Sequence, residues 1–143
     1  MKKTILMAVL LISTAFAAAE TPVDFVKKVY REVKANDNEG AVWDKYADSS
    51  LKSALRRADK AMQKSGEICL DAGMLYPGQD PDYSKTPQFS ATGNRVKVVV
   101  TQRGHRDTVY VVTNCTGGTC KISDVITGCL LYTSPSPRDR QKS

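Results

Sequence analysis

The spacing of apolar residues changes once along this chain, and the change constrains the class of fold. Upstream of a loop-like stretch from Met74 to Pro87, apolar residues recur at helical intervals, which is typical of amphipathic helices. Downstream of it they alternate with polar residues, as in Val96-Lys97-Val98, which is typical of strands. The order predicts an α+β fold, with two to three N-terminal helices packed on an antiparallel meander of three to four strands.

Two long helices and a short helical turn are expected in the first half. Thr21 is a good N-cap residue, and Pro22 suits the first helical position after it. Asp48 or Ser49 suits the cap of the second long helix. The first helix carries an apolar stripe of Val26, Val29, Tyr30 and Val33. The second carries Leu51, Ala54, Leu55, Ala58 and Met62. The short turn lies around Val42, Trp43 and Tyr46.

A Gly-Gly turn near the end of the expected meander predicts a disulfide. Strands are expected at 88–91, 96–100, 107–113 and 120–127. Gly-Gly supplies positive φ at both central positions of a type I′ turn, so Thr116 and Thr119 form the hydrogen-bonded pair that closes it. Cys115 and Cys120 then face each other at the next pair, with their Cα atoms about 4.5 Å apart and within reach of a disulfide.

Residues 1–19 have the three-part layout of a secretory signal peptide. Lys2 and Lys3 are followed by an apolar run and by small residues that end at Ala17-Ala18-Ala19, with a second acceptable cleavage site two residues earlier. The apolar run is shorter than the roughly 20 residues that a spanning helix needs. We therefore expect a periplasmic or secreted bacterial protein without a transmembrane anchor, in a compartment that permits disulfides.

Residues 129–143 follow neither pattern. Their string, rich in Ser, Pro and Arg, resembles the in-frame translation of a sequencing adapter, and a natural disordered tail is the alternative. We expect a single domain at 20–128 that lacks its C-terminal element, with Cys69 either a buried hydrophobe or the partner of a cysteine beyond it. This domain holds 16 of the 21 Lys and Arg and 14 of the 15 Asp and Glu, so its net charge is +2 where the chain has +6. Such a balance predicts no nucleic-acid binding.

Several short motifs resemble a known family in their order. They are Val-Lys-Lys-Val-Tyr in the first helix, Tyr-Pro-Gly-Gln-Asp at 76–80 and Lys-Ile-Ser-Asp-Val at 121–125. Together with the signal peptide they are similar to an uncharacterised family of small exported bacterial proteins in the nuclear-transport-factor-two-like superfamily. The resemblance implies a cone in which a curved sheet encloses a pocket, but no function, because that cone hosts isomerases, dehydratases and binding modules. Cys120 departs from the tryptophan that such proteins often have there.

The scarcity of histidine limits the catalytic and metal sites that this chain can form. His105 is the only histidine and is expected to be a solvated turn residue, so no Ser or Cys nucleophile has an imidazole partner and zinc has no cluster. Asp71, Asp80 and Asp82 lack the spacing of a calcium loop and are expected to cap turns. No catalytic residue, metal site or cofactor is predicted.

The expected partner is a small ligand or an envelope protein, bound without catalysis. The candidate binding residues come from the aromatic loop and the expected pocket: Tyr76, Gln79, Asp80, Tyr83, Tyr110 and Asp124. Two alternatives stay open, an isomerase- or dehydratase-like enzyme with a carboxylate base and an inhibitor or immunity protein against an envelope hydrolase. A basic helix face is expected either to be solvated or to dock weakly on an anionic envelope component. It comprises Lys52, Arg56, Arg57, Lys60 and Lys64.

Overall fold

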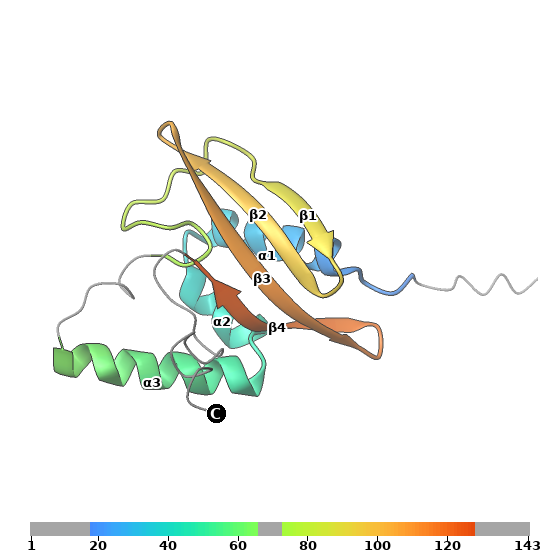
Figure 1. Cartoon of the computed structure of the whole chain (residues 1–143), viewed down its shortest axis with the longest axis horizontal. Coiled ribbons are helices and arrows are strands. Elements are labelled where there is room, and N and C mark those ends of the chain that lie inside the picture. Colours follow the sequence, from blue (N-terminus) through green and yellow to red (C-terminus); the bar gives the residue numbers. More distant parts are fainter. Residues whose placement is uncertain (1–17, 66–72, 128–143) are drawn as a thin grey trace, which may run out of the picture.

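Helices precede strands in the computed structural model, which describes residues 18–65 and 73–127 (Figure 1). The helices are α1 (Pro22–Asn36), α2 (Glu39–Tyr46) and α3 (Ser49–Ser65). The strands are β1 (Gln88–Thr92), β2 (Arg95–Gln102), β3 (His105–Thr116) and β4 (Thr119–Ile126). The predicted α+β order is therefore confirmed.

The strands form one open antiparallel meander in the order β1-β2-β3-β4. Tight turns at 93–94, 103–104 and 117–118 join neighbouring strands, and each contains a glycine with positive φ. The register between β3 and β4 shifts between Val112 and Thr113. A shift of this kind bends and twists the strands, and β3 curves along its length in Figure 1.

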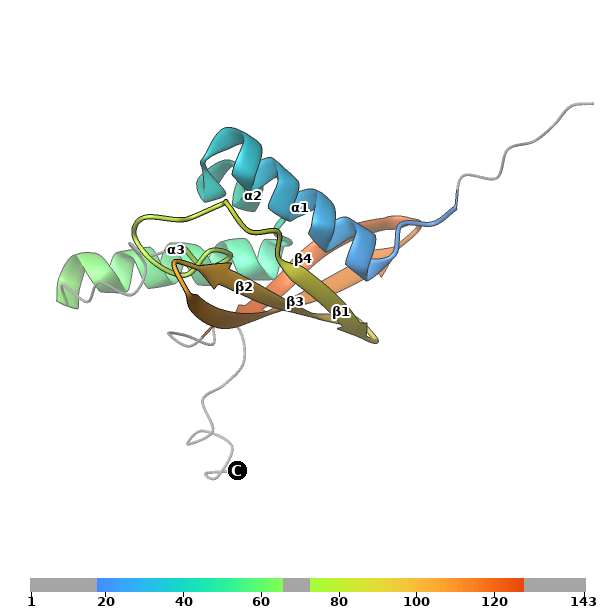
Figure 2. The same ribbon diagram turned by 90° about the horizontal axis from the view of Figure 1, so that it is seen from above.

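The helices cover one face of this sheet. Figure 2 shows α1 running above the strands, where it contacts β1, β2 and β3. The apolar stripe of α1 is fully buried at Val26, Val29 and Val33, and it meets the alternate valines of β2, of which Val96 and Val98 are also fully buried. The apolar stripe of the helix and the alternate valines of the strand, both predicted from their spacing, thus pack together in a single core.

Side chains at the helix starts behave as the sequence predicts. The Thr21 hydroxyl accepts a hydrogen bond from the Asp24 backbone N–H at 3.2 Å. The Asp48 carboxylate accepts one from the Leu51 N–H at 2.8 Å, which makes Asp48 the cap of α3. Each cap satisfies a donor that has no partner inside the helix.

The predicted disulfide hairpin is present. Thr116 pairs with Thr119 at the turn, and the next pair, Cys115 and Cys120, has an S–S distance of 2.04 Å and a Cα–Cα distance of 4.0 Å. Cys120 is buried, and its sulfur lies 3.6 Å from the backbone oxygen of Glu20. The hairpin therefore lies against the segment that leads into α1.

Several sequence predictions concern residues outside the described part of the chain. These are the signal peptide up to residue 17, Cys69 and Asp71 within 66–72, and the tail at 129–143. Among the helices that are described, none has the length and apolar character needed to cross a membrane.

Replacing both Cys115 and Cys120 with alanine is expected to lower the free energy of unfolding by about 2 kcal/mol, because the bridge closes only a short loop in the unfolded chain. Urea denaturation of the oxidised double variant and of the parent chain measures this difference. Equal denaturation midpoints at equal slopes would contradict it.

Candidate functional site

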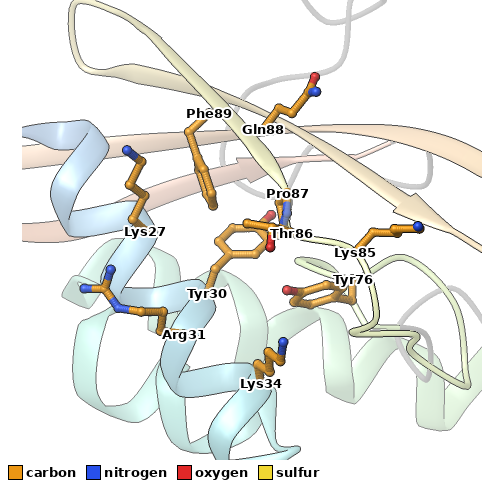
Figure 3. A pocket seen from close by; sticks show the side chains of 10 residues that line it. All are labelled: Lys27, Tyr30, Arg31, Lys34, Tyr76, Lys85, Thr86, Pro87, Gln88 and Phe89. Carbon is orange, nitrogen blue, oxygen red and sulfur yellow. The ribbon is translucent and has the colours of Figure 1, made fainter.

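An open groove of about 660 Å³ lies between α1, β1 and the segment that leads into β1. We call it the α1–β1 groove, and Figure 3 shows the side chains that line it. They are Lys27, Tyr30, Arg31, Lys34, Tyr76, Lys85, Thr86, Pro87, Gln88 and Phe89. The groove thus combines aromatic rings with basic side chains.

Aromatic rings form a connected row in and beside the groove. Phe89 points from β1 toward Tyr30 in Figure 3, and the two ring centroids are 5.3 Å apart at an interplanar angle of 83°. Tyr76 lies 5.3 Å from Tyr30 on the other side, and Tyr83 packs edge-on against Tyr76 at 4.7 Å. Edge-to-face pairs at these distances are favourable, so the rings hold one another in place.

Four cations surround these rings. Lys27, Arg31 and Lys34 follow one another along α1 at helical spacing and are exposed, and Lys85 approaches from the segment before β1. Within residues 18–65 and 73–127, none of the four forms an ion pair. The groove lining contains no carboxylate. The cations of the lining are therefore not paired with a carboxylate of the groove.

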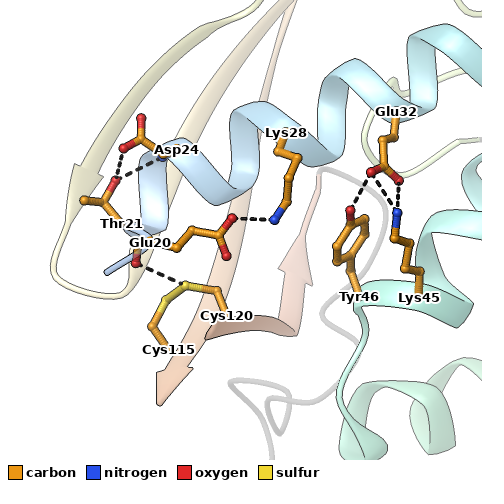
Figure 4. Close-up of polar contacts among 9 residues, drawn as sticks. All are labelled: Glu20, Thr21, Asp24, Lys28, Glu32, Lys45, Tyr46, Cys115 and Cys120. Carbon is orange, nitrogen blue, oxygen red and sulfur yellow. Dashed lines mark hydrogen bonds and ion pairs between the residues drawn. A yellow bond between two sulfur atoms is a disulfide. The ribbon is translucent and has the colours of Figure 1, made fainter. Parts of the chain in front are cut away.

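The carboxylates at α1 are engaged elsewhere, as Figure 4 shows. Glu20 pairs with Lys28. Glu32 accepts hydrogen bonds from the Tyr46 hydroxyl at 2.5 Å and the Lys45 ammonium at 2.9 Å. The Tyr46 bond, followed by the Lys45 bond, lowers the pKa of Glu32. Asp24, in the first turn of α1, accepts a hydrogen bond from the Thr21 hydroxyl at 2.8 Å. None of these three carboxylates forms an ion pair with a cation of the groove.

The carboxylate of Glu39 fixes the loop that carries Tyr76. One oxygen accepts a hydrogen bond from the Met74 N–H at 2.9 Å, and the other accepts from Leu75 at 2.9 Å and from Tyr76 at 3.0 Å. A Cβ atom on Gly73 would lie 2.8 Å from this carboxylate and 2.7 Å from the Tyr76 carbonyl oxygen, so glycine is required there. We call these three hydrogen bonds the Glu39 clasp.

Tyr30 joins the clasp to the groove. Its hydroxyl donates a hydrogen bond to the Leu75 carbonyl at 3.0 Å, while its ring lines the groove. Burial, followed by the nearby Glu39 charge, raises the pKa of Tyr30 and raises that of Tyr76 to about 12. Both phenols therefore stay neutral near pH 7, and the charge of the lining comes from its Lys and Arg side chains.

Among the predicted binding residues, Tyr76 lines the groove and Tyr83 packs beside it. The Tyr83 hydroxyl donates to the Asp37 carboxylate at 2.7 Å, which directs it away from the lining. Gln79 is exposed on the loop and does not line the groove. Tyr110 alternates with the buried Val109, so it lies on the opposite face of the sheet.

The structure does not bring the two candidate carboxylates together. Asp80 is exposed and pairs at 2.5 Å with Arg103, in the turn between β2 and β3. Asp124 is buried on β4, where its carboxylate accepts from the Val125 N–H and where it pairs in register with Val112. Val112 lies opposite the start of β2, at the end of that strand remote from Arg103. Neither carboxylate lines the groove.

The other residues considered for chemistry have structural surroundings. Asp82 accepts from the backbone N–H groups of Ser84 at 2.9 Å and Arg103 at 3.3 Å, and these bonds, the Ser84 bond first, lower its pKa. His105 is exposed, as expected, but it is not a turn residue, because it begins β3 opposite Gln102 directly after the turn at 103–104. Among residues 18–65 and 73–127, no cluster of His, Cys, Asp or Glu could hold a metal ion.

Sequence reasoning missed the basic side of the groove. Lys27, Arg31 and Lys34 recur at i, i+4 and i+7, a spacing that places them on one flank of a helix. That signal was available, but basic stripes are common on solvated helix faces, and α3 has a longer one. Only the packing of β1 beside this flank distinguishes the two.

No family model, curated protein or solved structure matches this chain. The resemblance to the nuclear-transport-factor-two-like superfamily therefore stays a prediction.

Replacing Glu39 with alanine is expected to lower the free energy of unfolding by about 3 kcal/mol, because three backbone N–H groups lose their acceptor in a partly buried loop. Glu32→Gln, which changes a more exposed carboxylate, is the matched control and is expected to cost under about 1 kcal/mol. Chemical denaturation measures both. Equal losses in the two variants would contradict a special role for Glu39.

The clasp also predicts a pH dependence. Burial raises the pKa of Glu39, and its hydrogen bonds to Tyr76, Met74 and Leu75 offset only part of that effect. A raised folded-state pKa contributes stability that is complete below the ordinary Glu pKa of about 4.3 and is lost as the pH rises through the folded-state pKa. The stability of the parent chain relative to Glu39→Gln should therefore fall as the pH increases across that window. Denaturation midpoints from about pH 4 to 7 measure the difference, and a constant or rising difference would contradict this prediction.

Proposed function

We propose that this chain is an exported, non-catalytic binding module that holds an anionic ligand in the α1–β1 groove. The observation that carries the proposal is the group of four cations without ion pairs around three aromatic rings, in a lining without carboxylates. Arg31 suits bidentate binding of a carboxylate or phosphate, and the lysines suit point contacts with the same groups.

The rings supply the second half of the proposed recognition. Phe89 is partly exposed and offers apolar surface beside the cations, while the Tyr30 and Tyr76 rings that pack with it are almost fully buried. Covering such surface contributes about 0.025 kcal/mol per Å² before the costs of association are subtracted. The ligand class is therefore an anion with an apolar portion.

Two rival functions are less well supported by the described residues. An enzyme with a carboxylate base needs that group in its pocket, whereas Asp80 is exposed in an ion pair and Asp124 lies on β4. The basic stripe on α3 is the alternative anion site, but none of its residues lines the α1–β1 groove. An inhibitor or immunity role stays a prediction that no particular contact favours.

A pair of dyes tests the proposal on the full chain. Anilinonaphthalene sulfonate is an anion with an aromatic body, and phenylnaphthylamine is its uncharged counterpart. The variant Lys27→Gln, Arg31→Gln, Lys34→Gln is expected to bind the sulfonate about tenfold more weakly, since exposed charge pairs contribute about 0.5 kcal/mol each. The uncharged dye should bind both chains alike in a fluorescence titration.

A matched triple variant on α3 controls for net charge. Arg57→Gln, Lys60→Gln, Lys64→Gln removes the same numbers of Lys and Arg from an exposed helix face and should leave the sulfonate affinity within about twofold of the parent. If the two triple variants lost equal sulfonate affinity, the loss would be explained by net charge and not by the groove. Sulfonate affinity unchanged in the α1 variant would refute the groove as the anion site.

A further inference from the structure

The outer edge of β1 forms the rim of the α1–β1 groove. β1 is the end strand of the sheet, and in the described part of the chain its only strand neighbour is β2 (Figure 1). Gln88 and Phe89 belong both to this strand and to the groove lining. A ligand in the groove therefore lies beside the backbone of an end strand.

The hairpin register shows which backbone groups face outward. Thr92 and Arg95 flank a two-residue turn and so form a hydrogen-bonded pair. Pairs alternate in type along an antiparallel ladder, so Ala91 with Val96 and Phe89 with Val98 are non-hydrogen-bonded pairs. The N–H and C=O groups of Phe89 and Ala91 consequently point away from β2, toward the rim of the groove.

The two edges of the sheet differ in their protection. At β4, the Ile122 carbonyl accepts a hydrogen bond from the Asp48 N–H at 2.8 Å, and Ala47 forms a bridge to the same residue. β1 has no such cover among the described residues, and it contains no proline, no charged residue and no bulge. End strands usually carry one of these protective features. The bare edge of β1 is therefore suited to pairing with another chain.

The positive charge of the groove indicates what kind of strand could be added to β1. Phe89 and Ala91 face the helix side of the sheet, so alternate side chains of an added strand would face the same way. That side presents Lys27, Arg31 and Lys34. A second copy of β1 would bring no carboxylate, since the strand is uncharged, whereas an acidic segment would neutralise the cations.

Building on the proposed anion groove, we propose that its occupant is an extended acidic segment of another protein, which adds to β1 as a further strand. Backbone groups of Phe89 and Ala91 pair with the segment, and alternate carboxylates of the segment contact Lys27, Arg31 and Lys34. A small anion would satisfy the cations but leave this row of backbone groups unused, and strand addition uses both.

A variant separates strand pairing from anion binding. Ala91→Pro removes one outward N–H while keeping the hydrogen bonds to β2, the rings and every cation, and an edge position tolerates proline. On the full chain, a fluorescent peptide of alternating Glu and Val should bind Ala91→Pro about tenfold more weakly than the parent. Anilinonaphthalene sulfonate should bind both equally, and a cooperative urea transition verifies that the variant is folded.

Peptide chemistry provides a second test on the unaltered chain. Methylating the backbone nitrogens of the Glu residues, or those of the Val residues, blocks one edge of the peptide or the other. One methylated peptide should lose binding and the other should keep it, because only one edge faces β1. Hydrogen exchange at the Phe89 and Ala91 amides should slow with peptide and not with the dye.

The outcomes distinguish strand addition to β1 from anion binding in the groove. Equal binding of both methylated peptides, or an unchanged peptide affinity in Ala91→Pro, would refute strand addition. If the dye still bound in that case, the proposed anion groove would stand. Absence of both dye and peptide binding overturns the proposed function itself. Binding to phosphatidylglycerol vesicles with no peptide binding, or peptide-independent self-association through β1, would equally refute the acidic segment.

Discussion

The carboxylate of Glu39 joins parts of the molecule that are far apart in the sequence. It lies at the start of α2, yet it accepts three backbone hydrogen bonds from the loop that precedes the sheet. The same loop receives the Tyr30 hydroxyl from α1. Because three N–H groups converge on one partly buried anion, the loop has little freedom to move relative to the helices. The position of Tyr76, and with it one wall of the α1–β1 groove, depends on this contact.

Local patterns in the sequence predicted most of the fold. The stripe of α1, the alternation in β2 and the Gly-Gly turn each report on contacts between near neighbours, and the disulfide follows from the register that the turn imposes. The Glu39 clasp has no such local signature, because Glu39 and its partners are more than thirty residues apart. From the sequence alone, a carboxylate at a helix start indicates only a favourable interaction with the helix dipole.

The candidate site was predicted only in part, for a related reason. Tyr76 was identified because its loop is aromatic and rich in proline, and those features are visible in the sequence. The acidic residues proposed with it lie elsewhere, since Asp80 turns outward to Arg103 and Asp124 is on the far strand. The cations on α1 can be identified as site residues only from the tertiary structure, in which β1 packs beside them. The same structure shows that Glu20 and Glu32 are paired with Lys28 and Lys45. These pairings depend on tertiary contacts, which local sequence patterns do not reveal.

The engagement of Glu20 and Glu32 has an effect that reaches beyond the groove. Lys28 is paired with Glu20 and Glu32 is bonded to Lys45 and Tyr46, while Lys27, Arg31 and Lys34 line the groove, so charge is distributed unevenly about the axis of α1. At separations up to a Debye length, roughly 10 Å at about 0.1 M salt, this asymmetry would exert a torque on the molecule near a negatively charged body. The protein would thus turn its groove toward such a body before touching it, so ionic strength would act on the rate of encounter more than on the lifetime of the complex.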